Sequence, residues 1–194
     1  MIKLLHSRGV FTPKALFSNP SSHFSCRYAS SSSINLKMES EFYTFGPYKI
    51  NQKEVFYSTA LSYALVNLKP VIPGNVLVCP RREVKRFVDL TVEETSDLWL
   101  AAQNVGNRIE HHYNASSLTF SIQDGPQAGQ TVPHVHIHIL PRKSGDFKNN
   151  DEIYDAVDVK EKELKEKLDL DKERKERSFE EMAQEADELR KLFA

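Results

Sequence analysis

Three histidines alternate with apolar residues in the run His-Val-His-Ile-His-Ile-Leu at positions 134–140. The intervening β-branched residues favour an extended backbone, and successive side chains of a strand point to opposite faces. We therefore predict that His134, His136 and His138 line one face of a strand, about 6.5–7 Å apart per step of two residues. The opposite face would bury the three intervening residues, Val135, Ile137 and Ile139.

A row of imidazoles suits more than one kind of site. Because its unperturbed pKa is about 6.5, histidine acts as a nucleophile, a proton carrier or a charge partner near neutrality. Imidazole is also a common zinc ligand, but a zinc site needs further ligands in fixed geometry, and His111 and His112 are candidates by residue type alone. Covalent phosphate chemistry needs one attacking imidazole with neighbours that meet the developing charge. The simplest alternative is a solvated strand face with three polar residues.

The sequence around these histidines resembles a known family. The pattern His-x-His-x-His with apolar x, followed by two more apolar residues, resembles the signature of the histidine triad nucleotide hydrolases and transferases. The preceding run Ser121–Val132 and the following run Pro141–Phe147 resemble the fragile histidine triad branch, whose members hydrolyse diadenosine triphosphate. The resemblance covers roughly residues 42–158, and it implies a homodimer that binds an adenine dinucleotide or another adenylyl substrate.

The resemblance assigns a role to each histidine. It makes His136 the nucleophile that attacks the α-phosphorus and forms a nucleotidyl-imidazole, which water then resolves. It implies that His138 binds non-bridging oxygens or assists the leaving group. It gives His134 a similar role, or that of fixing the ring of the nucleophile. A neutral imidazole nitrogen is both a good nucleophile and a good leaving group, so that one displacement becomes two easier ones.

Other positions match substrate-binding residues of the family. A glutamine before the triad matches the residue that contacts the phosphate chain and orients the incoming group, and the loop into the triad offers further donors. An asparagine matches a ribose-binding position, and three apolar residues match an adenine slot. These predicted substrate-binding residues are Gln123, Gln130, Thr131, Asn67, Phe45, Ile50 and Leu77. The chain departs from the branch at Asn75, where members often carry a histidine, and Asn does not titrate near neutrality.

Three functions remain open at this point. The first is a hydrolase that cleaves diadenosine triphosphate to AMP and ADP through AMP bound covalently to His136, with adenylyl sulfate as a further substrate that the resemblance allows. The second is a dinucleotide-binding signalling module with slow hydrolysis, and the third is a nucleotidyl transferase. A divalent cation, Mg²⁺ or Mn²⁺, is expected to bind through substrate phosphates because it prefers oxygen ligands, and no tightly bound metal is expected.

The remaining patterns predict an α+β domain with a mostly antiparallel sheet, one long core helix and C-terminal helices. Branched and aromatic runs predict strands, and the capping box Thr91-Val92-Glu93-Glu94 predicts the start of the long helix. That helix would continue to about His112, burying one apolar stripe. The predicted strands lie near residues 42–45, 48–50, 54–58, 63–67, 75–79, 117–122 and 134–140, and the predicted stripe consists of Leu98, Leu100, Ala101, Val105 and Ile109.

The two ends of the chain differ from this domain, which is assigned to residues 39–158. Residues 1–38 contain five Lys or Arg, nine Ser and no acidic residue. This composition predicts a transit peptide for a mitochondrion or chloroplast, or a disordered tail, and a start at Met38 would leave a cytoplasmic form. Residues 159–177 read as a charged, solvated helix or linker. A second capping box opens residues 178–194, which we predict to be a helix that docks on the core or on a partner subunit. Its predicted apolar stripe consists of Phe179, Met182, Ala186, Leu189 and Phe193.

Composition excludes several other classes of protein. The formal net charge of −1 gives no electrostatic footprint for nucleic acid. No apolar run reaches the roughly 18 residues of a membrane span. Cys26 and Cys79 are far apart and form no CxxC motif, which argues against a disulfide framework and a cysteine-based zinc site.

Overall fold

The computed structural model describes residues 42–166 and 177–194, which belong to one unit, Met38–Ala194. The predicted targeting segment 1–38 and residues 167–176 of the predicted linker lie outside the described residues. The described residues form two sheets, and every neighbouring pair of strands in them is antiparallel. With the helices described below they confirm the predicted α+β class.

A short hairpin precedes the main sheet. β1 (Phe42–Phe45) pairs with β2 (Tyr48–Asn51) across a turn at Gly46. The φ angle of Gly46 is +54°, and a Cβ there would lie 2.9 Å from the side chain of Val132. Glycine is therefore required at this turn by both its backbone conformation and the close packing.

The main sheet has five strands in the order β3-β4-β5-β7-β6. β4, β5 and β7 are buried along their whole length, which explains the nearly continuous apolar sequences of β4 and β5, whereas β7 also carries His138 and Arg142. β3 and β6 form the two edges of this sheet. The bounds are β3 Val55–Ser58, β4 Ser62–Val66, β5 Val76–Pro80, β6 Ser117–Ser121 and β7 Ile137–Arg142.

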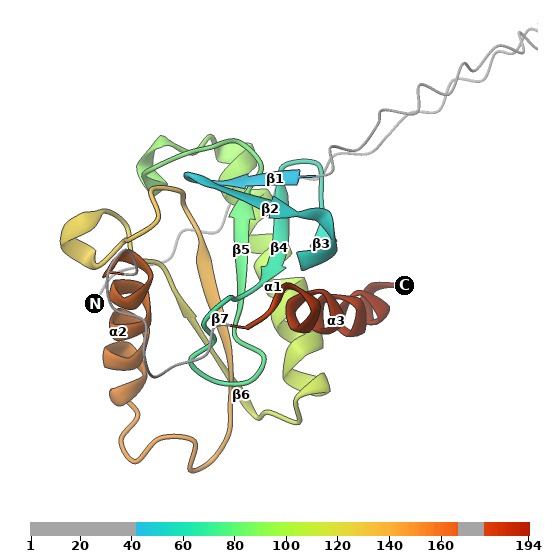
Figure 1. Ribbon diagram of the computed structural model, residues 1–194, viewed down its shortest axis with the longest axis vertical. Helices are drawn as coiled ribbons and strands as arrows, with labels where there is room; N and C mark the ends of the chain where they lie inside the picture. The colour runs from blue at the N-terminus through green and yellow to red at the C-terminus, as the bar shows by residue number, and fades with distance from the viewer. Residues whose placement is uncertain (1–41, 167–176) are drawn as a thin grey trace, which may run out of the picture. The chain divides into compact units, whose positions relative to one another are not determined.

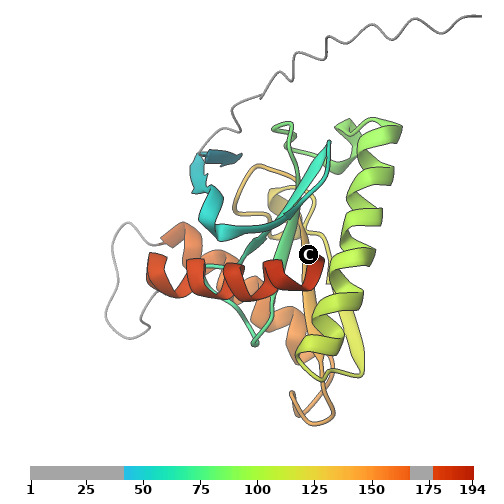
Figure 2. The ribbon, with the colours of Figure 1, turned by 90° about the vertical axis from the view of Figure 1, so that its right-hand side faces the viewer.

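Two helices cover one face of this sheet (Figures 1 and 2). α1 (Val92–His112) begins with the predicted capping box, in which Thr91 and Glu94 bind each other's backbone N–H groups. α3 (Phe179–Arg190) begins with the equivalent box of Ser178 and Glu181, so both predicted helix starts are confirmed. Both helices share one core with the sheet: Val76, Val78, Leu98, Ala101, Val105, Ile109, Val135, Ile137, Ile139, Met182, Ala186 and Leu189.

The predicted stripes were wrong at two positions. Leu100 on α1 is 64% exposed and Phe179 on α3 is 40% exposed. Leu98 and Ala101 point into the core, so the 100° step per residue turns Leu100 away from the sheet. Phe179 is the first residue of α3 and precedes the turn that reaches the core.

The opposite face of the sheet carries the histidines. The hairpin β1–β2 covers one part of it through Phe45, which packs with Leu65 and Leu77. α2 (Glu152–Glu166) covers another part through Ile153 and Val157, which pack on Leu140. α2 therefore includes the first residues of the predicted charged segment.

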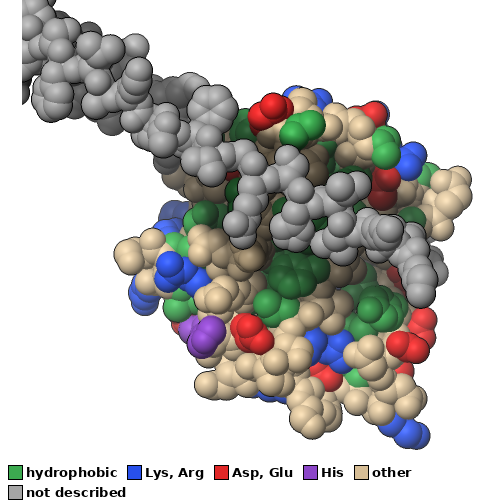
Figure 3. All heavy atoms as spheres, turned by 180° about the vertical axis from the view of Figure 1, so that it is seen from behind, with side chains coloured by type: hydrophobic (Ala, Val, Ile, Leu, Met, Phe, Trp, Pro, Cys, Tyr) green, Lys and Arg blue, Asp and Glu red, His purple; other side chains and the backbone are tan. Residues whose placement is uncertain are grey.

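The outer surface carries charges of both signs. On the face seen in Figure 3, Lys and Arg side chains lie near Asp and Glu side chains, with apolar side chains between them. None of the helices in the described ranges is long and apolar enough to cross a bilayer. Three short 3₁₀ helices connect the core elements, η1 (Gln52–Glu54), η2 (Phe87–Asp89) and η3 (Pro126–Ala128), and a fourth, η4 (Lys191–Phe193), follows α3.

Candidate active site

The three histidines lie together beneath the hairpin, and all are buried. His134, His136 and His138 are 0%, 1% and 3% exposed, and the ring centroids of His136 and His138 are 5.0 Å apart. As predicted, the intervening apolar residues point to the opposite face, into the core shared with α1. The prediction of a single strand through all three was wrong, however, because β7 begins only at Ile137. His134 and His136 therefore lie on the segment that leads into the strand.

His134 is held by the backbone on both sides of its ring. Its Nδ1 accepts a hydrogen bond from Gly46 N–H at 3.2 Å, and its Nε2 lies 2.9 Å from the carbonyl oxygen of Pro80. A carbonyl only accepts, so Nε2 must carry the proton and Nδ1 the lone pair. Burial lowers the pKa of His134, which keeps this ring neutral. With both nitrogens engaged, the side chain joins the hairpin to β5, and it offers no free donor to a phosphate.

His136 has a defined orientation. Its Nδ1 lies 2.7 Å from the carbonyl oxygen of His134. Since that oxygen can only accept, Nδ1 carries the proton, and Nε2 of the neutral ring carries the lone pair. The ring also packs edge-on against Phe45, with centroids 5.2 Å apart and an interplanar angle of 81°. The resemblance predicted that His134 either binds phosphate oxygens or fixes the ring of His136. This geometry agrees with the second role, because the backbone carbonyl of His134 binds the ring of His136.

The loop before the triad is fixed by Gln130. Its Nε2 donates to the carbonyl oxygens of Lys85 and His134 at 3.1 and 3.3 Å, and its Oε1 accepts from Gly125 N–H at 3.0 Å. All these contacts of the side-chain amide are to backbone groups, and one of them supports the carbonyl group that orients His136. The predicted contact of this loop with phosphate stays a prediction.

A second contact anchors the same loop. The carboxylate of Asp124 accepts two hydrogen bonds from the Arg86 guanidinium, each 3.1 Å, and one from Phe87 N–H at 2.8 Å. These bonds lower the pKa of Asp124, with the Arg86 side chain as the largest cause. The loop between β6 and the triad is thus tied to the segment that follows β5. Thr131 is half-buried on this loop.

The three residues predicted for an adenine slot lie together. Phe45 and Leu77 are buried, and the half-buried Ile50 packs against the same cluster. Leu77 is paired with His138 in the register of β5 and β7. The apolar cluster therefore adjoins the histidine row, although the residues come from three different strands.

Asn67 and Asn75 form one buried hydrogen-bonded pair. Asn67 Nδ2 donates to Asn75 Oδ1 at 3.1 Å, and Asn67 Oδ1 accepts from Lys69 N–H at 3.0 Å. Asn75 Oδ1 also accepts from Val71 N–H, and its Nδ2 donates to the carbonyl of Ile139, each at 3.3 Å. The side chain of Asn75 thus fixes the amide of Asn67 with neutral groups, and the contact requires no titrating residue.

Gln123 has a partner that no sequence pattern indicated. Its Nε2 lies 2.5 Å from Oδ1 of Asp158, a residue of α2. Asp158 belongs to no motif, and it is one acidic residue among many in the C-terminal third of the chain. Contacts of this kind depend on how a helix docks, and a single sequence gives no signal for them.

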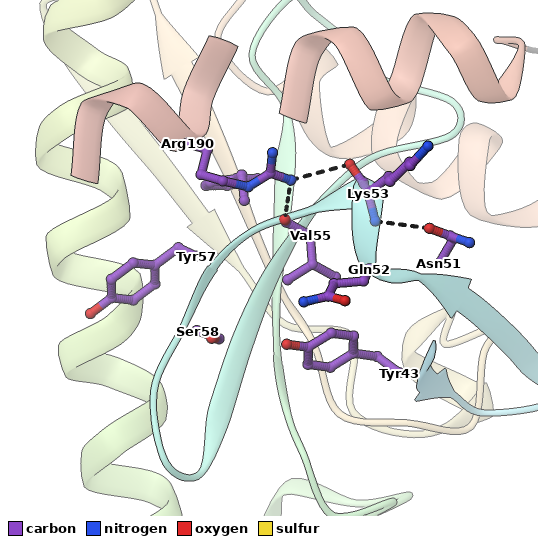
Figure 4. A pocket seen from close by; sticks show the side chains of 9 residues that line it. Tyr43, Asn51, Gln52, Lys53, Val55, Tyr57, Ser58 and Arg190 are labelled. Carbon is purple, nitrogen blue, oxygen red and sulfur yellow. Dashed lines mark hydrogen bonds between the residues drawn. The ribbon is translucent and has the colours of Figure 1, made fainter. Parts of the chain in front are cut away.

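Two other features lie away from the histidines. A groove of 610 Å³ runs between β3, the hairpin and α3, lined by residues such as Tyr43, Lys53 and Arg190 (Figure 4). Arg190 donates to the carbonyl oxygens of Val55 and Lys53 at 2.8 and 3.4 Å, which joins α3 to β3. Over the described ranges, no group of three or more His, Cys, Asp or Glu side chains is placed to hold a metal ion. His111 and His112 are exposed at the end of α1.

Comparison with known proteins identifies the arrangement. The model of the HIT domain matches residues 49–145, which include all three histidines, Asn67 and Gln123. The chain belongs to the histidine triad (HIT) family. A relative from Arabidopsis thaliana, named bifunctional bis(5'-adenosyl)-triphosphatase/adenylylsulfatase FHIT, is 72% identical over 151 residues, or 78% of this chain and 84% of that protein.

Two further similar proteins support this assignment. The bis(5'-adenosyl)-triphosphatase of Dictyostelium discoideum is 56% identical over 149 residues, which are 77% of this chain and 91% of that protein. The crystal structure of the C. elegans NitFhit protein aligns with a TM-score of 0.64 and 43% identity, over 79% of this chain and 31% of the longer one. The predicted family and fold are therefore confirmed.

The HIT site of this chain can present one imidazole as a nucleophile. The Nε2 lone pair of His136 is fixed in direction by the bond from Nδ1 to the backbone. An apolar cluster lies on one side of it, and the amide of Gln123 comes from the adjacent strand segment. In a buried setting, polar groups that are already oriented stabilise developing charge more strongly than water does.

Proposed function

We propose that the chain is a hydrolase that cleaves diadenosine triphosphate to AMP and ADP, with AMP bound to His136 as the intermediate. The observation that carries the proposal is the oriented His136, whose Nδ1 binds the carbonyl oxygen of His134 at 2.7 Å. The names of the two curated relatives described above, both bis(5'-adenosyl)-triphosphatases, support the choice of substrate.

The first step is an in-line displacement at the α-phosphorus. The Nε2 lone pair of His136 forms the bond to phosphorus, the bond to the bridging oxygen breaks, and ADP leaves with the electron pair. His138 lies next to His136 on the same face and is proposed to stabilise the non-bridging oxygens or the leaving group. Because Nδ1 keeps its proton, the nucleotidyl ring is positively charged and is a good leaving group in the second step.

In the second step a water molecule attacks the phosphorus. The bond from phosphorus to Nε2 breaks, its electron pair returns to the ring, and AMP and one proton are released. The adenine is proposed to lie against Phe45, Ile50 and Leu77, and the ribose to bind Asn67, whose amide Asn75 fixes. Mg²⁺ or Mn²⁺, which prefer oxygen ligands, are proposed to bind phosphate oxygens of the substrate.

Adenylyl sulfate is a second proposed substrate. It presents the same adenylyl group, linked to sulfate as the leaving group, so the same attack would give AMP and sulfate. The relative at 72% identity is named a bifunctional triphosphatase and adenylylsulfatase, which favours this addition.

A substrate panel with a trapped intermediate tests the proposal. Purified protein is incubated with diadenosine triphosphate, diadenosine tetraphosphate and adenylyl sulfate, and mass spectrometry measures products and AMP bound to His136. We expect His136→Asn to bind the nucleotide with nearly unchanged Kd but to lose more than about 10³-fold in kcat. His111→Asn, on an exposed helix end, is the control and should retain full activity.

The alternatives predict different results in the same experiment. A nucleotidyl transferase would pass AMP to phosphate or a sugar phosphate in competition with water, and product analysis with these acceptors detects it. A signalling module would keep its cellular effect in His136→Asn, although hydrolysis is lost. Normal turnover by His136→Asn would reject covalent catalysis at this residue.

We also propose that the protein is a homodimer. β6 hydrogen-bonds to β7 on one side, and no strand in the described ranges pairs with its other edge. Beside that edge, Phe120 of β6 is 38% exposed and contacts Trp99 of α1, which is 42% exposed. An open strand edge beside exposed aromatic side chains favours pairing with a second copy.

A further inference from the structure

The contact between Gln123 and Asp158 joins two elements over the histidine face. Gln123 follows β6, whereas Asp158 lies on α2, 35 residues later in the sequence. The distance from Nε2 to Oδ1 is 2.5 Å, and Gln123 is 8% exposed. A charged acceptor makes such a bond roughly twice as strong as a neutral one.

The docking of α2 brings Asp158 to this position. Val157 and Ile153 pack against Leu140 of β7. Leu140 follows His138 by two residues, so both side chains lie on the same face of the sheet. Asp158, next to Val157 on the helix, then reaches the end of the neighbouring strand.

A glycine allows the two side chains to meet. Gly129 has a φ of +91°, and a Cβ there would lie 2.8 Å from Gln123 Nε2 and 3.2 Å from Asp158 Oδ1. The loop backbone therefore passes directly against the pair, and a side chain at this position would separate it. The contact is enclosed by three segments and is not an exposed surface pair.

Asp158 fixes which way the amide of Gln123 points. A carboxylate only accepts hydrogen bonds, so the NH₂ group must face it and the amide oxygen must face away. Oε1 of Gln123 is buried, and no donor within the described part of the chain reaches it. A buried acceptor of this kind is costly unless a donor is supplied.

The register of β6 and β7 indicates on which face of the sheet Gln123 lies. Ser121 is paired with His138, so their side chains lie on the same face. Continuing the antiparallel register by two residues brings Gln123 level with His136, again on that face. The oriented acceptor therefore belongs to the side of the sheet on which the proposed nucleophile lies.

We propose that Asp158 is a positioning residue for the hydrolytic step. By binding Nε2 of Gln123, it turns Oε1 to accept a hydrogen bond from the water that attacks the AMP–His136 intermediate. In this step the water oxygen bonds to phosphorus, the bond from phosphorus to Nε2 breaks with its electrons returning to the ring, and one proton leaves to solvent. Gln123 aligns the water and does not take the proton. The inference rests on the function proposed above.

A double-mutant cycle tests whether Asp158 acts through Gln123. Asp158→Asn keeps the shape but lets the facing amide donate as well as accept, so that Gln123 loses its preferred orientation. We expect kcat to fall about 10- to 100-fold, as for a misplaced reacting group, with KM changed less than twofold. In Gln123→Ala, which has lost the amide, Asp158→Asn should have no further effect.

The intermediate gives a readout that a merely structural role would not change. If only the second step is slowed, rapid-quench mass spectrometry should detect more AMP on His136 in Asp158→Asn than in the unmodified protein. Asp155→Asn, an exposed acidic residue of the same helix, is the matched control and should change neither value. Asp158→Glu retains a carboxylate acceptor and should recover part of the lost kcat.

The outcomes separate this inference from the function on which it rests. Equal effects of Asp158→Asn with and without Gln123 would overturn the inference, as would a change in KM alone without accumulation of AMP–His136. If thermal melting shows that Asp158→Asn is unfolded, Asp158→Glu replaces it in the cycle. Its effect on kcat is then compared between the unmodified protein and Gln123→Ala, and equal effects overturn the inference. Absence of AMP–His136 and of hydrolysis in the unmodified protein would instead overturn the proposed function.

Discussion

Each histidine of the row has different surroundings, although the sequence presents them as equivalent. His134 binds the backbone of Gly46 and Pro80 through its two ring nitrogens, whereas Nδ1 of His136 binds the carbonyl oxygen of His134. The first ring is therefore a structural support, and the second has its Nε2 lone pair fixed in direction. Alternation predicted the shared face, but the hydrogen bonds that distinguish the rings come from residues 54 and 88 positions away.

The buried, neutral His134 should make stability depend on pH. Burial lowers its pKa in the folded state, whereas the unfolded imidazole takes up a proton near its ordinary pKa of about 6.5. The unfolded state then binds more protons, so the free energy of unfolding falls as pH decreases below about 6.5, until the lower folded pKa is reached, by at most about 1.4 kcal/mol per pH unit.

Urea unfolding between pH 7.5 and 5 measures this dependence. His134→Gln should have a flatter slope over that range, because it removes the group whose proton binding differs between the two states. His111→Gln changes an exposed histidine and serves as the control. A slope that is identical in the unmodified protein and His134→Gln would show that other groups set the dependence.

At the scale of elements, the two faces of the sheet have separate roles. α1 and α3 enclose the apolar core on one face, while the hairpin and α2 cover the histidine face. Capping boxes and apolar spacing predicted α1 and α3 because those signals are local in the sequence. The start of β7 was misplaced because pairing with β5, which begins at Ile137, decides where the ladder starts.

The docking of α3 should contribute measurably to stability. Leu189 is fully buried against the core, and Arg190 binds two backbone carbonyls near β3. Leu189→Ala is expected to lower the free energy of unfolding by about 2–5 kcal/mol, because it removes buried methyl groups and leaves a cavity. Urea denaturation measures the loss.

An exposed position on the same helix provides the control. Phe179→Ala changes a side chain that is 40% exposed at the first residue of α3, and it should cost less than Leu189→Ala. Equal losses in the free energy of unfolding would mean that the buried side chains of α3 do not hold the helix against the core.

At the scale of the whole molecule, the edge of β6 should determine the oligomeric state. Light scattering after gel filtration is expected to give twice the chain mass of 22.2 kDa. Phe120→Lys would place a charge at the proposed interface and should shift the protein to the monomer. A monomeric unmodified protein would reject the proposed dimer.

A substitution elsewhere tests whether that shift is specific. Val88 on η2 is 77% exposed and apolar, so Val88→Lys adds the same charge at an exposed position outside β6. We expect Val88→Lys to remain dimeric, with unchanged activity.

Local sequence determined the family, the antiparallel α+β class, the two capped helices and the face shared by the histidines. These follow from short-range signals: strand alternation, helical spacing and a specific motif. Only the tertiary structure decided that Gln130 supports the loop, that Asn75 fixes Asn67, and that Asp158 meets Gln123. Those contacts join side chains from different segments, and their geometry is set by how elements pack, which periodicity in one chain does not encode.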